Sequence, residues 1–470
     1  MTDVDERGKI PNLMRIGAIS TDMSMDYDTF VLDPVVNNQN FTRFVLDNRG
    51  FLNSFSRIQV AVESNASAAV DASLPAGVGV YGLVDRVALR IGTEVVSEIT
   101  DFGHWMSYKS MFIDNDINLE RETYLTSRII SHACQLKSDA NGKMSNTNAS
   151  GYALSTKNEY IIDAAGDAGN LPVQEELKNK NAAEFSLSVA DLIPWLRFNQ
   201  LPLYMFGSTQ ISIEIHWISK ASQNRMIVGA GDQNASFNID TTKTQFIADY
   251  IYYDNELMDQ FANENANMNW TYTDYRLAKR SYLNTELETT QIFNIGGAGR
   301  ICNKVVSAIE FDQTNPSLSM LGVYHSTAPD LSGVDNTFFT TNLVYNNNRL
   351  YPVDRTNPAV HFHDVISTEQ NVPQISRQEY SRGGGAGTDS GILTDYTYNG
   401  KEQHTSDEGL DGNFFWNGYR LNRNERVDST GINLELQYGN LTAGTYIHRS
   451  YLELVKNARL INGMFSTELA

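Results

Sequence analysis

The sequence predicts an all-β protein built from two fused jelly-roll β-barrels, with short helices and long loops. Three observations predict it: segments in which apolar and polar residues alternate, a length of 470 residues, and a similar order of elements in the two halves. Alternation with a period of two is typical of strands that bury one face. A chain of 470 residues exceeds what one hydrophobic core usually organises. We therefore expect an N-terminal jelly roll with an arm over residues 1–225 and a C-terminal jelly roll over residues 226–470.

The predicted strands are the segments in which the alternation is clearest. In Gln210–Trp217, the isoleucines at 211, 213 and 215 occupy every second position. The other segments expected to form half-buried strands are Arg57–Val62, Arg86–Ile91, Val305–Asp312 and Ile432–Tyr438.

Helical patterns are few and short. Asp101–Phe112 places Phe102, Trp105 and Met106 on one face of a helix, with Asp101 as the expected N-cap. A second short helix is expected over residues 118–130. Two long polar connections, residues 138–179 and 381–408, are rich in Gly, Asn, Ser and Asp, and are expected to be loops that carry function or decorate a surface.

The two halves repeat the same order of elements. In the first half, a strand at Val87–Ile91 leads through Val95-Val96 into the helix after Asp101. In the second half, a strand at Phe338–Tyr345 leads through Leu350-Tyr351 into a candidate helix at Asn357–Ser367. Each half then has a long loop, an aromatic segment and an alternating strand, and a junction near residues 219–245 accounts for this order. Strand number and long connections favour jelly rolls over a plain β-sandwich, which is the alternative.

The charge, the hydropathy and the cysteine content argue against several classes of protein. The formal charge is −20, from 56 acidic and 36 basic residues, so extensive binding to a nucleic-acid backbone is disfavoured. No apolar run has the form of a signal peptide or a transmembrane segment. The two cysteines, Cys134 and Cys302, are far apart and lack a CxxC partner, so neither a disulfide framework nor a zinc site is expected.

Two glycine-rich segments do not predict nucleotide binding. Gly77–Gly82 spells GxGxxG, but strand-like residues follow it instead of the helix that a pyrophosphate site needs, so a turn is expected. Gly383–Ser390 lacks the Gly-Lys-Ser/Thr ending through which a P-loop holds phosphate and Mg²⁺, and is interpreted as a surface loop.

Other candidate sites have simpler interpretations. His361-Phe362-His363-Asp364 would place two imidazoles on one face of a strand, as a metal site requires, but a third ligand is missing and a polar turn entering a helix is favoured. The acidic residues Asp114, Asp116 and Glu120 resemble glycosidase carboxylates only by proximity in sequence. The aromatic segment Asn269–Tyr272 is assigned to packing rather than sugar binding. We nominate no catalytic, cofactor-binding or metal residue, and no enzyme activity is expected.

Four segments resemble one known family, the double jelly-roll major capsid proteins of Polinton-like viruses, virophages and larger eukaryotic DNA viruses. They span both halves of the chain. Gly50–Val60 resembles the family's early strand, and Arg86–Ser97 with Asp101–His104 resembles the strand, hairpin and helix of its first barrel. Phe185–Ser188 with Leu201–Phe206 and the strand from Ile211 resembles the close of the first barrel, and Leu343–Pro352 resembles the corresponding segment of the second barrel.

The resemblance implies homotrimers of pseudo-hexagonal outline that self-assemble into the icosahedral shell of a double-stranded DNA virus. It also implies separate penton and minor capsid proteins as partners, assembly inside the host cell, location in the virion, and outward-facing towers built from residues 138–179 and 381–408. The alternative functions are a carbohydrate-binding or carbohydrate-cleaving β-sandwich protein and a viral spike protein.

Overall fold

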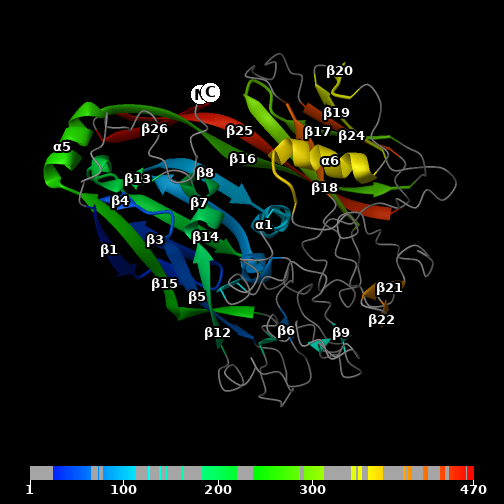
Figure 1. The fold of residues 1–470 in the computed structure, drawn as a ribbon, viewed down its shortest axis with the longest axis horizontal. Coiled ribbons are helices and arrows are strands. Elements are labelled where there is room, and N and C mark those ends of the chain that lie inside the picture. Colours follow the sequence, from blue (N-terminus) through cyan, green and yellow to red (C-terminus); the bar gives the residue numbers. More distant parts are fainter. Residues whose placement is uncertain are drawn as a thin grey trace.

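The computed structural model shows an antiparallel β protein whose sheets form two groups side by side (Figure 1). The description below covers residues 25–64, 72–73, 78–112, 125–126, 137–138, 144–145, 161–162, 182–197, 200–219, 237–285, 290–311, 340–345, 348–351, 358–373, 395–398, 401–404, 416–421, 434–439, 444–461 and 463–469.

The first group consists of two facing sheets. One has the strand order β1, β15, β5, β12, and the short strands β4 and β13 join it beside β15. The other has the order β2, β3, β14, β7, β8. The bounds of the first sheet are β1 (Met25–Leu32), β15 (Phe237–Tyr253), β5 (Arg57–Ser64), β12 (Ala182–Ser188), β4 (Phe51–Leu52) and β13 (Leu201–Pro202), and those of the second are β2 (Val36–Asn38), β3 (Phe41–Leu46), β14 (Ile211–Trp217), β7 (Val84–Ile91) and β8 (Glu94–Thr100).

Short helices close this first group. Helix α1 follows strand β8 and lies at the centre of the molecule, against the second group (Figure 1). The bounds are α1 (Phe102–Ser110), α4 (Val189–Leu192) and the 3-10 helices η2 (Gly79–Leu83), η4 (Pro194–Arg197) and η5 (Leu203–Phe206).

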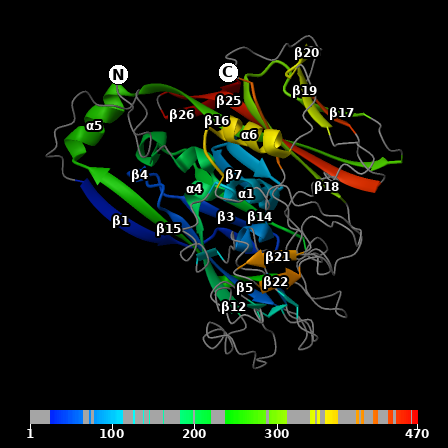
Figure 2. The ribbon, with the colours of Figure 1, turned by 45° about the vertical axis from the view of Figure 1, so that its right-hand side comes forward.

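The second group repeats the arrangement. One sheet has the order β16, β25, β18, β23, with β26 added beside β25, and the other has the order β17, β24, β19, β20. Helix α6 follows β20 in the chain and contacts β23. Figure 2 shows α6 (yellow) beside the strands of this group. The bounds are β16 (Asn267–Asn284), β25 (Gly444–Ile461), β18 (Cys302–Phe311), β23 (Asn417–Arg420), β26 (Met464–Leu469), β17 (Gln291–Gly296), β24 (Leu434–Gly439), β19 (Thr340–Tyr345), β20 (Asn348–Arg349) and α6 (Pro358–Glu369).

The remaining described elements are one connecting helix and three small pairs of strands. Helix α5 (Asn255–Glu264) links β15 to β16 at the far end of the first group (Figure 1). The small paired strands are β6 (Ala72–Ser73) with β11 (Ile161–Ile162), β9 (Lys137–Ser138) with β10 (Met144–Ser145), and β21 (Asp395–Tyr398) with β22 (Lys401–His404).

The repeated order predicted from the sequence is confirmed, strand for strand. The series β1, β15, β5, β12 corresponds to β16, β25, β18, β23, and the series β3, β14, β7, β8 corresponds to β17, β24, β19, β20. Helices α1 and α6 occupy the same place in the two series. Each group is thus built on two sets of four corresponding antiparallel strands, the arrangement of a jelly roll, and β2, β4, β13 and β26 are added to these sets.

The predicted strands coincide with strands β5, β7, β14, β18 and β24, and their alternating apolar residues form the core. Ile58 and Val60 of β5 are fully buried, as are Ile213 and Ile215 of β14. The predicted helices after Asp101 and near Asn357 are α1 and α6. The second short helix expected over residues 118–130 lies outside the described residues apart from 125–126.

The pairing of strand β15 shows how far the first group extends along the sequence. It follows the predicted division between residues 225 and 226, and yet it pairs with β5 through Phe237–Asp240 and Gln245–Ile247 and with β1 through Phe246–Tyr253. The strands of the first group therefore continue as far as Tyr253, and helix α5 follows them in the chain.

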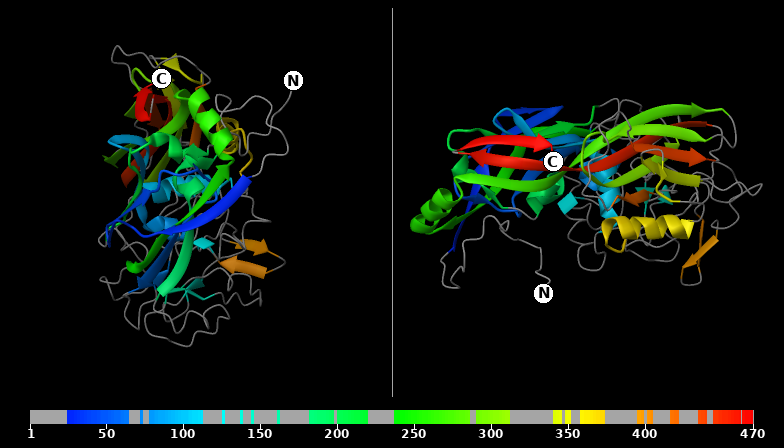
Figure 3. Two further views of the ribbon diagram at one scale, coloured as in Figure 1. Left: turned by 90° about the vertical axis from the view of Figure 1, so that its left-hand side faces the viewer. Right: turned by 90° about the horizontal axis from the view of Figure 1, so that it is seen from above.

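Strands β16 and β25 are long enough to extend along both groups. They pair with each other over 18 residues each. Strand β25 pairs on its other side with β18 as far as Leu454 and with β26 from Lys456 onward. The view from above in Figure 3 shows this pair extending along the molecule from the first group to the second. The two groups are therefore joined by continuous strands as well as by side-chain contacts.

Candidate functional site: the joint between the two jelly rolls

A cluster of buried charges and aromatic rings lies where the two groups meet. Strand β8 and helix α1 contribute to it from the first group, and β16, β25 and α6 from the second. We call this region the joint. Its contacts hold the described sheets of the two groups against each other.

The carboxylate of Asp101 is one centre of the joint. It accepts hydrogen bonds from Arg449 Nε at 2.8 Å and Lys279 Nζ at 2.7 Å, both from the second group, and from His104 Nδ1 at 2.7 Å. Burial opposes ionisation of this carboxyl, but His104 and Arg449 outweigh that effect and hold its pKa well below the usual range. Asp101 is therefore an ionised group with cations around it.

Asp101 is the N-cap residue of helix α1, as the sequence predicts. Its side chain makes no capping hydrogen bond, however, and its backbone has a left-handed conformation with φ of 55°. Asp and Asn adopt this conformation more readily than most residues. The carboxylate instead points to the second group, where Arg449 and Lys279 provide the stronger, charge-assisted partners.

Glu369, the last residue of α6, is the second charged centre. Its carboxylate accepts hydrogen bonds from Tyr108 Oη at 2.6 Å, Lys304 Nζ at 2.7 Å and Lys109 Nζ at 3.2 Å. Burial alone would raise the pKa of Glu369, but Lys109 and Lys304 outweigh it and lower the pKa to about 2. Lys304 also contacts Glu453 at 3.0 Å, so the lysine bridges carboxylates of α6 and β25. Tyr108 and Lys109 belong to α1, so their hydrogen bonds to Glu369 link α1 to α6.

Strand β16 covers the open edge of strand β8. Tyr272 Oη donates to the Val96 carbonyl oxygen at 2.7 Å, and the Asp274 carboxylate accepts from the Glu98 backbone N–H at 3.2 Å. Lys456 of β25 pairs with the same carboxylate. An uncovered sheet edge presents unpaired backbone groups to other chains. Here side chains of the second group satisfy some of those groups.

Aromatic rings fill the space between these polar contacts. Trp105 of α1 is fully buried, and its ring lies 4.1 Å from that of Tyr275 and 5.4 Å from that of Tyr451, measured between centroids. Farther along β16, Trp270 stacks on Trp195 at 6.1 Å with an angle of 4° between the planes. Aromatic pairs of this kind contribute beyond the area they bury. The joint is therefore a packed core as well as an ion cluster.

The last described strand, β26, fastens the second group to the first. The Phe465 ring lies 5.8 Å from Phe206 of η5 and 5.9 Å from Trp270 of β16. Thr467 Oγ1 donates to Glu94 of β8 at 3.2 Å. Residues near the end of the sequence thus pack on elements from its first half.

The structure separates the residues that the sequence placed in a possible metal site. His361 and His363 lie within helix α6, so they belong neither to the strand considered for a metal site nor to a polar turn that enters a helix. Two positions apart on a helix, they point in different directions: His361 is buried and His363 is exposed. Within the described part of the chain, no group of three or more His, Cys, Asp and Glu residues could hold a metal ion.

The other candidate motifs have the following positions. Within Gly77–Gly82, residues 79–82 belong to the 3-10 helix η2, which leads directly into strand β7 and opens no α-helix. Asp114, Asp116, Glu120 and residues 383–390 lie outside the described residues, as do most of 138–179 and 381–408. Burial raises the pKa of the Cys302 thiol. Trp270 and Tyr272, assigned to packing, are buried in the joint.

Sequence reasoning missed the charged residues of the joint. Asp101, Arg449, Lys304 and Glu369 come from four separate elements, and no local spacing connects them. The one available signal was the sequence around Arg449, where charged side chains interrupt an alternating strand of Tyr, Ser and Leu residues. In addition, none of the helices in the described residues is both long and apolar enough to span a membrane.

Several solved structures match this chain over almost its whole length. The PBCV-1 virus capsid model has a TM-score of 0.56 and 11% identity, covering 97% of this chain and 99% of that one. The Faustovirus major capsid protein has a TM-score of 0.53 and 9% identity, covering 94% and 92%. The mavirus major capsid protein has a TM-score of 0.52 and 9% identity, covering 99% and 93%. No family model and no curated protein matches this chain. The chain therefore has the double jelly-roll fold that the sequence predicts, and it shares that fold with the capsid proteins of PBCV-1, Faustovirus and mavirus.

Proposed function

We propose that the chain is a major capsid protein, the structural subunit of an icosahedral double-stranded DNA virus shell. One observation carries the proposal: the fold matches viral capsid proteins over more than nine-tenths of both chains, at TM-scores above 0.5 for three viruses. A shared β-sandwich core alone would give partial coverage. Matching of both jelly rolls in their relative arrangement is specific to the double fold.

The joint supports a role in which shape is the function. Its ions are paired and its rings are packed, so the two jelly rolls are held as one rigid block. A shell of repeated subunits needs such a block, because its interfaces depend on surfaces kept in fixed relative positions. The charge of −20 favours solubility over extensive binding to nucleic acid.

The finer parts of the proposal are as follows. The chain forms homotrimers with a pseudo-hexagonal outline, contacts neighbouring capsomers and separate penton and minor capsid proteins, and catalyses no reaction. It assembles inside the host cell and resides in the virion. Each jelly roll is a domain, with the division at α5, because both sheets of the first group are complete before that helix.

Electron microscopy and sedimentation of the purified full-length protein test this function. We expect particles of trimer mass with a pseudo-hexagonal outline, and closed shells under some conditions of concentration and salt. Monomers alone, at every concentration and ionic strength tried, would overturn the proposal.

A further inference from the structure

The turn that joins β17 to β18 combines three glycines with an arginine. It consists of residues 296–300, with the sequence Gly-Gly-Ala-Gly-Arg, and connects strands of two different sheets in the second group. We call it the glycine turn. Gly296, Gly297 and Gly299 have positive φ values of 89°, 94° and 72°. Residues with a Cβ rarely adopt such values, so the turn depends on glycine for its shape.

Several backbone donors of the glycine turn are unused within the chain. Gly296 N–H donates to Asn294 Oδ1, and Arg300 N–H donates to the Gly297 carbonyl oxygen, both at 3.1 Å. Among the described residues, the N–H groups of residues 297–299 have no hydrogen-bond acceptor. Successive backbone N–H groups in a turn are a recurrent means of binding anions. The turn therefore offers three donors to a ligand.

Two guanidinium groups lie at the same turn. A Cβ added at Gly296 would lie 3.9 Å from Arg276 Nη1, so the guanidinium of Arg276 on β16 lies beside the turn. Arg276 is exposed, and Arg300 is half-buried. Burial lowers the pKa of Arg300, and the charge of Arg276 lowers it further, whereas Asp274 acts in the opposite direction. The two cations are therefore close enough to repel each other.

The nearby carboxylate of Asp274 is already engaged by other groups. It accepts a hydrogen bond from the Glu98 backbone N–H at 3.2 Å, and it pairs with Lys456. Arg276 and Arg300 form no ion pair with any residue that the structure describes. In a chain with a charge of −20, the glycine turn is thus a place where positive charge is left without a partner.

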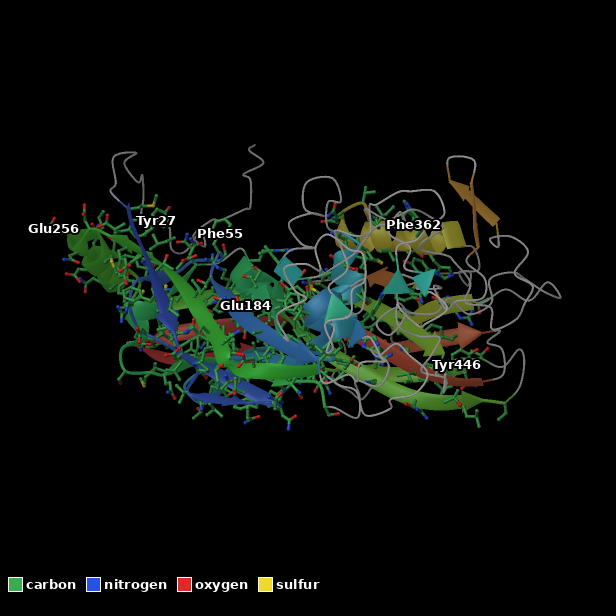
Figure 4. The ribbon with its side chains drawn as sticks, turned by 90° about the horizontal axis from the view of Figure 1, so that it is seen from below. Tyr27, Phe55, Glu184, Glu256, Phe362 and Tyr446 are labelled. Carbon is green, nitrogen blue, oxygen red and sulfur yellow. The ribbon has the colours of Figure 1, made fainter. Side chains whose placement is uncertain are left out.

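The corresponding connection of the first group neutralises its own arginine. It follows β3, the counterpart of β17, and precedes β5, the counterpart of β18. There, Arg49 Nη2 contacts Asp47 Oδ2 at 2.5 Å. The glycine turn contains no acidic residue. The acidic helix α5 does not supply one, because in Figure 4 its Glu256 lies at one end of the molecule and Tyr446 of β25 lies in the other half, with the strands of the second group.

We propose that the glycine turn, with Arg276 and Arg300, binds a compact oxyanion of the phosphate type, either free phosphate or a phosphomonoester. Guanidinium groups bind phosphate oxygens through charge-assisted, often bidentate hydrogen bonds, and the free N–H groups add further donors. A phosphodiester chain is disfavoured, because a protein charge of −20 repels an extended polyanion. All these groups belong to one chain, so binding does not depend on the proposed capsid function.

Calorimetric titration of the full-length protein with inorganic phosphate, at constant ionic strength, tests the site. We expect one ion bound per chain. Arg276→Gln and Arg300→Gln should each weaken binding by about 10-fold or more, because each removes charge-assisted hydrogen bonds. The matched control is Arg280→Gln. Arg280 is exposed four positions farther along β16, 5.8 Å from the centre of the Phe293 ring, and its loss should change the affinity by less than about 2-fold.

Thermal unfolding measures the same binding independently. Relative to chloride of equal ionic strength, phosphate should raise the melting temperature of the wild type and of Arg280→Gln, because the ligand binds the folded chain. It should leave Arg276→Gln and Arg300→Gln at the values they have in chloride. Those chloride values also report whether each variant is folded.

Three outcomes would overturn the proposal. One is that phosphate gives no binding heat and no melting shift in the wild type. Another is that Arg280→Gln weakens binding as much as Arg276→Gln, which would indicate a diffuse effect of positive charge. The third is tighter binding of an oligonucleotide without terminal phosphates than of phosphate. Phenyl phosphate distinguishes the two sources of the ligand: binding at least as tight as that of phosphate identifies a phosphomonoester, and weaker binding identifies the free ion.

Discussion

The guanidinium of Arg449 lies 2.8 Å from the carboxylate of Asp101, although the two residues are 348 positions apart in the sequence. Both side chains are nearly buried, with exposed fractions of 4% for Arg449 and 14% for Asp101. This ion pair joins the residue before α1 to the middle of β25, and so links the two jelly rolls at the place where their orientation is determined.

Removing the Arg449 cation should destabilise the protein strongly. Arg449→Met leaves the Asp101 carboxylate without its most buried partner, and breaking a buried ion pair costs about 3–5 kcal/mol. Urea unfolding at fixed protein concentration measures the change. The control is Arg459→Met, whose partner Glu468 lies 3.2 Å away on the surface, and whose loss should cost about 1 kcal/mol or less.

The double substitution makes this test sharper. Asp101→Asn tolerates the left-handed backbone and removes the charge. Combined with Arg449→Met, it should cost less than the sum of the two single changes, because neither ion then remains without its partner. Additive costs would show that the pair does not act as a unit.

Shortening Trp105 should open a cavity in the joint. The ring is fully buried between Tyr275 and Tyr451, so Trp105→Ala should lower the free energy of unfolding by about 3–5 kcal/mol. The matched control is Leu283→Ala, at a residue 65% exposed on β16, which should change stability by about 0.5 kcal/mol or less. Comparable losses for both variants would contradict the packing role of Trp105.

Helix α6 should be sensitive to a single methyl group on β23. A Cβ added at Gly418 would lie 2.6 Å from Thr368 Oγ1 and 3.1 Å from the Val365 Cα, closer than atoms normally approach. Gly418→Ala should therefore displace α6 and lower stability by about 1–3 kcal/mol. Gly207→Ala tests the opposite case: no atom lies within 4 Å of the added Cβ, and the residue has φ of 58°, so only backbone strain is introduced.

Buried His448 should make the protein less stable in acid. Burial lowers its pKa from 6.5 to about 3, and Arg449 and Arg280 add to the effect. The unfolded chain therefore binds a proton between these values that the folded chain does not, so stability falls as the pH decreases from 6.5 toward 3. His448→Gln removes this contribution, and its melting temperature should depend less on pH in that interval.

An exposed histidine provides the control for that measurement. His363→Gln alters an exposed side chain of α6 and leaves His448 in place, so the acid dependence of the wild type should persist. Parallel loss of stability in the wild type and His448→Gln would show that other groups cause the acid dependence.

The fold was predictable where hydrophobic alternation is clean, as in Ile211, Ile213 and Ile215 of β14. It was less predictable in the longest strands. In β25, the inward series includes His448 and Ser450, because these side chains find partners in Phe293 and in each other, and the alternating pattern is correspondingly weak. A long strand that extends along both groups has different neighbours at its two ends. A single pattern of alternating apolar and polar residues therefore does not describe its whole length.

The joint was largely hidden from sequence analysis. Trp270 and Tyr272 could be assigned to packing from their residue type, since large aromatic side chains are usually buried. The partnership of Asp101 with Arg449, by contrast, depends on how two distant strands cross, and a single sequence contains no record of that crossing. The sequence predicted correctly that Asp101 is the N-cap residue of a helix, but it carried no signal for the contacts of its side chain with the second group.

Strand β25 begins at Gly444, and its pairing with β16 has a consequence for the order of events during synthesis. The first jelly roll has all its strands by Tyr253, yet Trp105 and Asp101 receive Tyr451 and Arg449 only when the final part of the chain has been translated. Until then, the nascent chain presents an aromatic and charged surface without its cover. The first roll is therefore complete in its strands, but not in its contacts, until translation has reached β25.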